Sequence, residues 1–187
     1  DMYNKANGPP YPNEFVERYR IAQTQRNDRV TAWCHSELAR LKGHNMFDRG
    51  FNLYRTWADL RFVDAAIDPS ERRQNWCYAG DPRRANYGPQ GIGLTNTLRT
   101  WLSMWSLSDS FCCGRPHLAR IVEPSLVVQS LADSGVFPSD ARLIYESLGS
   151  FDKTIEMVPG DHYLQAPDGA RAHVADLIVG WLKDRGG

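Results

Sequence analysis

A histidine and an aspartate each follow a stretch of residues that is typical of a buried strand. His162 lies in VPGDHY, just after residues 153–158, and Asp133 lies in LADSGVFP, just after the continuous apolar run 125–131. A carboxylate that accepts a hydrogen bond from one imidazole nitrogen fixes the tautomer and leaves the other nitrogen free as a base. Together the two residues offer two thirds of a nucleophile–histidine–acid triad.

The segments around this pair alternate between strand and helix. The spacing of apolar residues predicts strand, helix, strand and helix over residues 125–131, 139–150, 153–158 and 167–185. Such an alternation indicates a βαβα unit with parallel strands. Because catalytic groups gather at the carboxyl ends of adjacent strands in an open α/β sheet, we expect Asp133 and His162 to emerge side by side.

Each residue of the pair also has a structural interpretation. Asp133 could close an Asx turn without doing chemistry, and His162 could cap a turn. Asp161 directly precedes the histidine and could replace Asp133 as its partner, but adjacent side chains on a turn usually diverge. We therefore favour the pair Asp133 and His162.

The part of the chain that precedes these elements opens with a long amphipathic segment. Residues 13–43 predict a single helix, with Asn13 as its N-cap and Gly43 at its end. Ser139 and Gly149 have the corresponding places in the helix that follows the first strand.

Aromatic and turn-forming residues dominate the region between the long helix and the strands. Residues 51–62 are predicted to form a strand or an irregular wall. Residues 67–93 are dense in Pro, Gly, Asp and Asn and predict a loop, whose length is typical of lids and binding loops. Residues 98–107 predict a short helix with two tryptophans, four residues apart, on one face.

The two predicted strands do not complete a sheet. Residues 125–131 are apolar on both faces, so this strand needs helices on both sides and a neighbour on each edge. Residues 153–158 supply one neighbour, and the chain offers no convincing candidate for the other. The chain also begins at Asp1 without an initiator methionine. We therefore expect the remaining strands to come from an N-terminal portion of the same gene product or from a partner chain.

From about Pro116 to its end, the chain resembles the C-terminal part of an α/β-hydrolase. LADSGVFP is similar to the turn that bears the catalytic acid in that family, and PGDHY to the end of the last strand, which delivers the catalytic histidine. The resemblance implies an α/β fold, with a mainly helical cap over residues 1–115 and the C-terminal part of the hydrolase core over residues 116–187. It also implies that Asp133 is the triad acid and His162 the general base.

The nucleophile of that family is missing from the chain. α/β-Hydrolases carry it in a G-x-S-x-G elbow between a strand and a helix, and no such motif occurs in the 187 residues. By the same resemblance, the loop that forms the oxyanion hole would lie in the absent half. The chain alone is therefore expected to be inactive, and a complementary N-terminal segment would supply a serine, or alternatively a cysteine or an aspartate.

The resemblance implies a serine hydrolase that cleaves an ester, or a related acyl bond, of a bulky apolar small molecule without a cofactor or metal. Trp57, Trp101 and Trp105 are candidate substrate-binding residues, because caps of this fold line an apolar pocket, although they could simply be core. Relatives on the same fold include acyltransferases, thioesterases and epoxide-opening enzymes. A non-catalytic binding or structural subunit that kept the fold and lost the elbow is the alternative from a different class.

The composition argues against several other classes of protein. Lys plus Arg and Asp plus Glu number 22 each, without a long basic block, which argues against nucleic acid or an anionic membrane as a partner. No apolar run approaches the roughly 20 residues that cross a membrane. The four cysteines match no zinc pattern and are expected to be reduced thiols in a cytoplasmic protein. A disulfide from Cys77 to Cys112 or Cys113 is the alternative.

Overall fold

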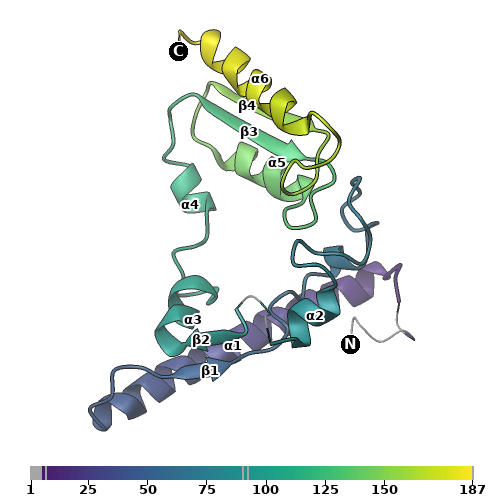
Figure 1. Cartoon of the computed structure of the whole chain (residues 1–187). Coiled ribbons are helices and arrows are strands. Elements are labelled where there is room, and N and C mark those ends of the chain that lie inside the picture. Colours follow the sequence, from purple (N-terminus) through teal and green to yellow (C-terminus); the bar gives the residue numbers. More distant parts are fainter. Residues whose placement is uncertain (1–5, 7, 90, 92, 187) are drawn as a thin grey trace. The chain divides into compact units, whose positions relative to one another are not determined.

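The chain divides into two compact units of mixed α and β structure. The computed structural model describes residues 6, 8–89, 91 and 93–186. The first unit comprises Asp1–Leu60 and Asp81–Cys113, and the second comprises Arg61–Gly80 and Gly114–Gly187. Each unit combines helices with a two-stranded sheet in its described residues, which confirms the general prediction of a mixed α/β chain (Figure 1).

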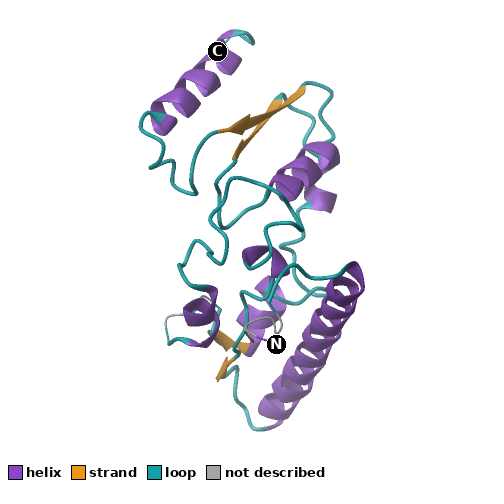
Figure 2. Ribbon diagram, turned by 90° about the vertical axis from the view of Figure 1, so that its right-hand side faces the viewer, coloured by secondary structure: helices purple, strands orange, loops and turns teal. Residues whose placement is uncertain are grey.

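The long helix of the first unit is the predicted one. Helix α1 spans Asn13–Gly43, as its apolar periodicity indicates (Figure 2). The predicted N-cap is wrong, because Asn13 is the first helical residue and Pro12 has the N-cap position without a side-chain cap. At the other end, the backbone N–H of His44 donates to the carbonyl of Leu41 at 2.9 Å.

The remaining elements of the first unit are short. Strands β1 (Gly50–Asn52) and β2 (Thr95–Thr97) pair antiparallel, and helix α3 spans Leu98–Met104. Helix α2 (Pro82–Tyr87) lies inside the stretch predicted as a loop, where the Asp81 side chain accepts from the N–H of Arg83 and caps it. That prediction is wrong for these residues, because an Asp followed by Pro is a helix start as well as a turn signal.

The core of the first unit lies between α1 and α3. Its buried residues are Cys34, Leu41, Leu98 and Trp101. Partly buried apolar residues pack around them, namely Val30, Leu38, Phe51, Leu53, Leu102 and Trp105. Apolar burial on one face of α1 therefore positions the short helix and the strands beside it.

The second unit contains the predicted parallel pair of strands. Strand β3 (Ser125–Ser130) and strand β4 (Lys153–Val158) pair in parallel, with Val127 opposite Ile155. Helix α5 (Pro138–Ser147) connects them, helix α6 (Ala170–Lys183) follows β4, and a short helix α4 (Arg115–Leu118) precedes β3. Helices α5 and α6 lie on opposite sides of the strand pair (Figures 1 and 2).

The start of α5 differs from the prediction. Phe137, not Ser139, has the N-cap position, and its backbone N–H donates to Oδ2 of Asp140 at 3.1 Å. The hydroxyl of Ser139 instead donates to Oδ2 of Asp68 at 2.7 Å. Ser139 thus fixes a distant segment rather than its own helix.

Residues Arg61–Gly80 form an irregular strap on the second unit. We call this stretch the 61–80 strap; the short 3-10 helix Leu60–Phe62 begins at the boundary between the units. The sequence prediction assigned the strap to residues 1–115, whereas its contacts place it with β3 and α5. Its backbone reaches the strand ends, because the N–H of Glu71 donates to the carbonyl of Leu131 at 2.9 Å.

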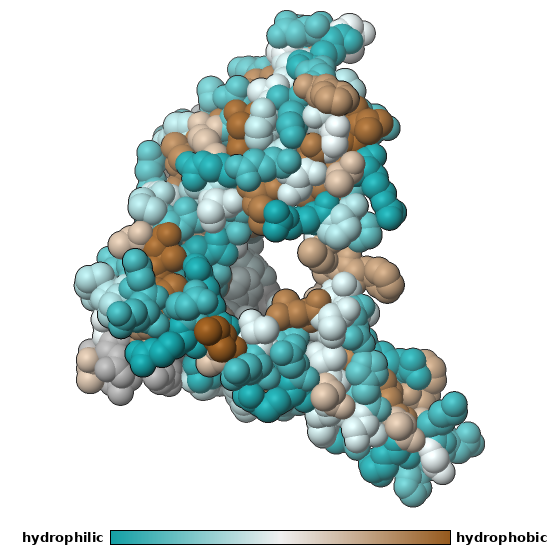
Figure 3. Space-filling view, turned by 180° about the vertical axis from the view of Figure 1, so that it is seen from behind, coloured by the Kyte–Doolittle hydropathy of each residue, from teal (hydrophilic) through white to brown (hydrophobic). Residues whose placement is uncertain are grey.

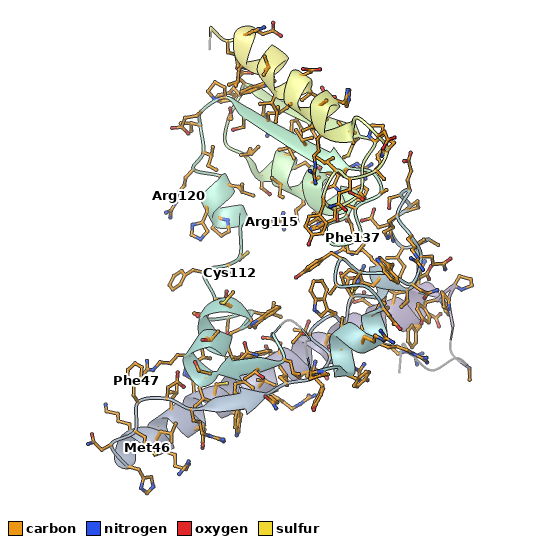
Figure 4. The ribbon with its side chains drawn as sticks, in the orientation of Figure 1. Met46, Phe47, Cys112, Arg115, Arg120 and Phe137 are labelled. Atoms are coloured by element: carbon orange, nitrogen blue, oxygen red, sulfur yellow. The ribbon has the colours of Figure 1, made fainter. Side chains whose placement is uncertain are left out.

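Phe137 is the apolar centre of the strap contacts. Its ring lies 5.4 Å from that of Phe62, and the guanidinium groups of Arg61 and Arg72 lie 4.1 and 4.8 Å from its centroid. Phe137 is only 2 % exposed. The stick view labels Phe137 at the start of α5 (Figure 4).

The β3–β4 pair is less completely covered than the apolar sequence of β3 predicts. Five of the six β3 residues, Ser125 to Val128 and Ser130, are half-buried, and Gln129 is buried. Apolar side chains of both helices also reach the surface of this unit, namely Leu143, Ile144, Ile178, Val179 and Leu182. Figure 3 shows such brown side chains among the polar ones of the surface. Among the described helices, none combines the length and apolar character needed to cross a bilayer.

Candidate functional site

The structure brings Asp133 and His162 into direct contact. β3 ends at Ser130 and β4 ends at Val158, so both residues lie in loops at the carboxyl ends of paired parallel strands. Nδ1 of His162 lies 2.9 Å from Oδ1 of Asp133. An ionised carboxylate only accepts hydrogen bonds, so Nδ1 is the donor, and in the neutral imidazole Nε2 then carries the free lone pair.

Backbone pairing continues beyond the strands and fixes the two loops to one another. The N–H of Leu131 donates to the carbonyl of Val158, and the N–H of Ala132 donates to the carbonyl of Gly160, each at 2.9 Å. The loop that carries Asp133 is therefore bonded to the loop that carries His162 through Ala132 and Gly160, one residue before the aspartate and two before the histidine.

Asp133 also closes its own turn. The same oxygen, Oδ1, accepts from the backbone N–H groups of Gly135 at 2.6 Å and Val136 at 3.0 Å. Asp133 is 8 % exposed, so these bonds lie out of bulk water. The Asp133 side chain thus closes an Asx turn and also bonds the imidazole of His162, so both interpretations of this residue hold.

Asp161 has a different task from Asp133. Its Oδ1 accepts from the backbone N–H groups of Tyr163 at 3.1 Å and Gln165 at 2.8 Å, which holds the turn after β4. The structure shows no hydrogen bond between Asp161 and His162, which agrees with the preference for Asp133 as the partner.

The imidazole of His162 is enclosed by aromatic rings and a glycine. The ring of Tyr78 stacks on it at 5.1 Å and 21°, and the ring of Tyr163 meets it edge-on at 4.8 Å and 82°. A Cβ on Gly135 would lie 3.1 Å from the imidazole, so a larger residue at this position would have to push the ring aside. His162 keeps a side-chain exposure of 29 %, and among the described residues Nε2 has no hydrogen-bond partner.

Tyr78 is the site residue that the sequence did not reveal. It belongs to the 61–80 strap, and the length of the 67–93 stretch is the one signal that pointed to a role for this region. Burial raises the pKa of the Tyr78 phenol, and the neighbouring Tyr163 and Cys77 add to the effect. The ring on the imidazole is therefore neutral at physiological pH.

The candidate substrate-binding tryptophans belong to the first unit. Trp101 is 5 % exposed and packs in the core with Leu98, and Trp105 packs partly buried against that core. The backbone N–H of Trp57 donates to Oδ1 of Asn86 at 2.9 Å, and the Asn86 amide donates back to the Trp57 carbonyl at 2.8 Å. Trp101 and Trp105 therefore have packing roles, and substrate contact by any of the three stays a prediction.

The cysteines are thiols, as expected. Cys34 and Cys77 are buried and Cys112 and Cys113 are exposed, without the alternative disulfide. The Cys77 thiol donates to the carbonyl of Gly80 at 3.2 Å. Within the part of the chain that the structure describes, no group of three or more His, Cys, Asp or Glu side chains could hold a metal ion.

The arrangement can accept a proton at Nε2 of His162 and stabilise the imidazolium that results. The described residues place no hydroxyl or thiol in hydrogen-bond contact with that nitrogen. The site is thus an oriented base next to its acid. No family model matches the chain, and neither the curated proteins nor the solved structures contain a match.

Proposed function

We propose that the chain supplies the acid and the general base of a serine-type α/β-hydrolase that cleaves an ester, or a related acyl bond, of a bulky apolar substrate. The observation that supports this most is the bond of 2.9 Å between Asp133 and His162 at the carboxyl ends of two parallel strands. The acid precedes the histidine in the chain, as in the family that the sequence resembles. A complementary segment carries the nucleophile.

The proposed reaction has two halves. Nε2 of His162 removes the proton of the serine hydroxyl while the serine oxygen attacks the carbonyl carbon of the substrate. The imidazolium then gives this proton to the leaving alcohol, which leaves an acyl-enzyme. In the second half, Nε2 removes a proton from water, the hydroxide attacks the acyl carbon, and the proton returns to the serine. Asp133 stabilises the imidazolium in both halves.

Complementation tests this function. The chain is combined with the segment encoded before it, provided that this segment carries a strand–G-x-S-x-G–helix sequence, and is assayed on p-nitrophenyl esters of rising acyl length. We expect His162→Ala and Asp133→Asn each to lower kcat by roughly 10³- to 10⁴-fold. His173→Ala on α6 is the matched control, because His173 is exposed, and its rate should equal that of the unmodified chain. Full activity of the His162→Ala protein would contradict the assignment.

A structural role without catalysis is the second candidate, and the turn bonds of Asp133 favour it. Oδ1 holds the N–H groups of Gly135 and Val136 whether or not any reaction occurs. The two functions separate in Asp133→Asn, because an amide oxygen still accepts both turn bonds. Loss of activity without loss of stability in this variant supports catalysis, whereas complementation without any esterase activity supports the structural role.

A further inference from the structure

Tyr78 lies at the tip of a tight turn that is closed on both sides. The backbone groups of Cys77 and Gly80 exchange two hydrogen bonds of 2.8 Å each, so Tyr78 and Ala79 are the two central residues of this turn. Gly80 takes a positive φ of 93°, which a side chain rarely adopts. Cys77 is fully buried and anchors the turn. The direction in which the Tyr78 ring projects is thus set by backbone geometry.

Polar groups stabilise the strap that carries this turn, and one bond connects it to α5. Arg72 is 6 % exposed and donates to the carbonyl groups of Asp68 and Arg61, and to the Ser70 hydroxyl. Asp68 in turn accepts from the hydroxyl of Ser139 on α5. These bonds hold the strap independently of the contact between Tyr78 and the imidazole.

We infer that Tyr78 is a positioning residue for His162: its stacked ring holds the imidazole in the plane in which Nδ1 meets Asp133 and Nε2 faces outward. The inference rests on the proposed function for its catalytic meaning. Asp133 fixes one ring atom, and a single hydrogen bond leaves the imidazole free to tilt about it. Tyr78 stacks on one face of the ring, Tyr163 meets it edge-on, and a Cβ added at Gly135 would lie only 3.1 Å from it.

The stack contributes ring contact and needs no phenolic oxygen. Offset-stacked aromatic pairs with centroids 4.5 to 7 Å apart are attractive beyond the area that they bury, and the Tyr78–His162 separation lies within about that range. Phenylalanine at position 78 keeps this contact, whereas leucine removes it with a smaller, non-aromatic side chain. The pair Tyr78→Phe and Tyr78→Leu therefore isolates the role of the ring.

The first test uses NMR on the chain by itself. In the unmodified protein we expect NOEs between the Tyr78 ring protons and Hε1 or Hδ2 of His162, and an upfield ring-current shift of the His162 protons relative to those of exposed His173. Tyr78→Phe should keep this shift and Tyr78→Leu should lose it. Tyr145→Leu is the control, because the Tyr145 ring lies by Lys153 at the start of β4. Absence of the NOEs in the unmodified protein overturns the inference, even if a variant fails to fold.

The second test measures the reactivity of the imidazole. Modification of His162 by diethyl pyrocarbonate, followed by mass spectrometry, should be about fivefold faster in Tyr78→Leu than in Tyr78→Phe, since loss of one stacked pair exposes the ring. Equal rates in the two variants contradict the positioning role. In the complemented enzyme, Tyr78→Leu should lower kcat with little change in KM, and Tyr78→Phe should restore it. If complementation gives no enzyme, the proposed function fails, while the NMR and modification results still decide the role of Tyr78.

Discussion

At the scale of single residues, Asp133 concentrates three hydrogen bonds on one carboxylate oxygen. Oδ1 accepts from two backbone N–H groups and from the imidazole. Charge-assisted bonds of this kind are about twice as strong as neutral ones, and they hold the carboxylate in place beside the imidazole. Alanine at this position would remove the two hydrogen bonds that close the turn as well as the carboxylate that bonds His162. This is why asparagine is the informative substitution.

Cys34 is the residue whose ionisation the fold controls most clearly. It is fully buried in the core of the first unit, and burial, together with the charge of Asp48, raises the pKa of its thiol to about 11. The protonated thiol is therefore the form that the fold stabilises. This contribution to stability is present below the ordinary thiol pKa of 9.0 and is lost as the pH rises through about 11.

We predict that alkylation distinguishes the buried Cys34 thiol, with its raised pKa, from the exposed cysteines. In the native protein at pH 8, iodoacetamide should modify exposed Cys112 and Cys113 and leave Cys34 intact. Cys34 should react when the pH approaches 11 or when guanidinium unfolds the chain. Cys34→Ala, as the matched variant, should lose less stability than the unmodified chain between pH 9 and 11. Rapid modification of Cys34 in the native protein at pH 8 would show that the thiol is not held in the core.

At the scale of elements, the strap and α5 are joined through Phe137. Its ring packs against Phe62 and lies beneath the guanidinium groups of Arg61 and Arg72. The aromatic ring replaces water for both arginines, while their N–H groups bond to carbonyl, hydroxyl and carboxylate oxygens. The packing of the 61–80 strap, which carries Tyr78, thus depends on Phe137 at the start of α5.

We predict that Phe137→Ala lowers the free energy of unfolding by about 3 to 5 kcal/mol, since the ring is buried and its removal leaves a cavity. Phe151→Ala is the control, because Phe151 is fully exposed and its loss should change stability by less than about 0.5 kcal/mol. Urea unfolding followed by circular dichroism measures both. Equal midpoints for the two variants would show that the strap does not depend on Phe137.

The elements that were predicted correctly are those whose pattern is local. The apolar periodicity of residues 13–43 and the strand-like run 153–158 determine α1 and β4, and both have the predicted bounds. The contact between Asp133 and His162 was predictable from the strands, since parallel strands bring their carboxyl ends together.

The features that the sequence concealed depend on contacts between distant residues. Ser139 has the sequence signature of an N-cap, but its hydroxyl bonds to Asp68, which is 71 residues away. Tyr78 meets His162 because the strap folds onto the second unit, and no local periodicity encodes that contact. Strands β1 and β2 have three residues each, which is too short for an alternating pattern to be recognised.

At the scale of the whole molecule, strand β3 has one paired edge among the described residues. The N–H groups of Ser125 and Leu131 donate to β4 and its flanks, so the alternation along a strand directs those of Leu126 and Val128 to the other edge. A complementary segment that completes the sheet would bond there.

We predict that the exchange rates of the β3 backbone amides show whether this edge is unpaired. In the chain alone, the amides of Leu126 and Val128 should exchange much faster than those of Val127 and Gln129, which face β4 in the same strand. Addition of the complementary segment should slow Leu126 and Val128 and leave the other two unchanged. If all four amides are equally protected in a monomer of this chain, the sheet does not need a further strand.

The second unit is built from two separate segments of the chain, Arg61–Gly80 and Gly114–Gly187. The ribosome therefore makes its two parts at different times. The hydrogen-bonded residues Asp68 and Ser139 are 71 residues apart. A ribosome that adds about 5 to 20 residues per second places roughly 4 to 14 s between the two. During that interval Phe62, which is buried in the finished protein, lacks its partner Phe137 and the helix that begins there. The nascent chain therefore presents an apolar segment that a chaperone can bind before synthesis reaches His162.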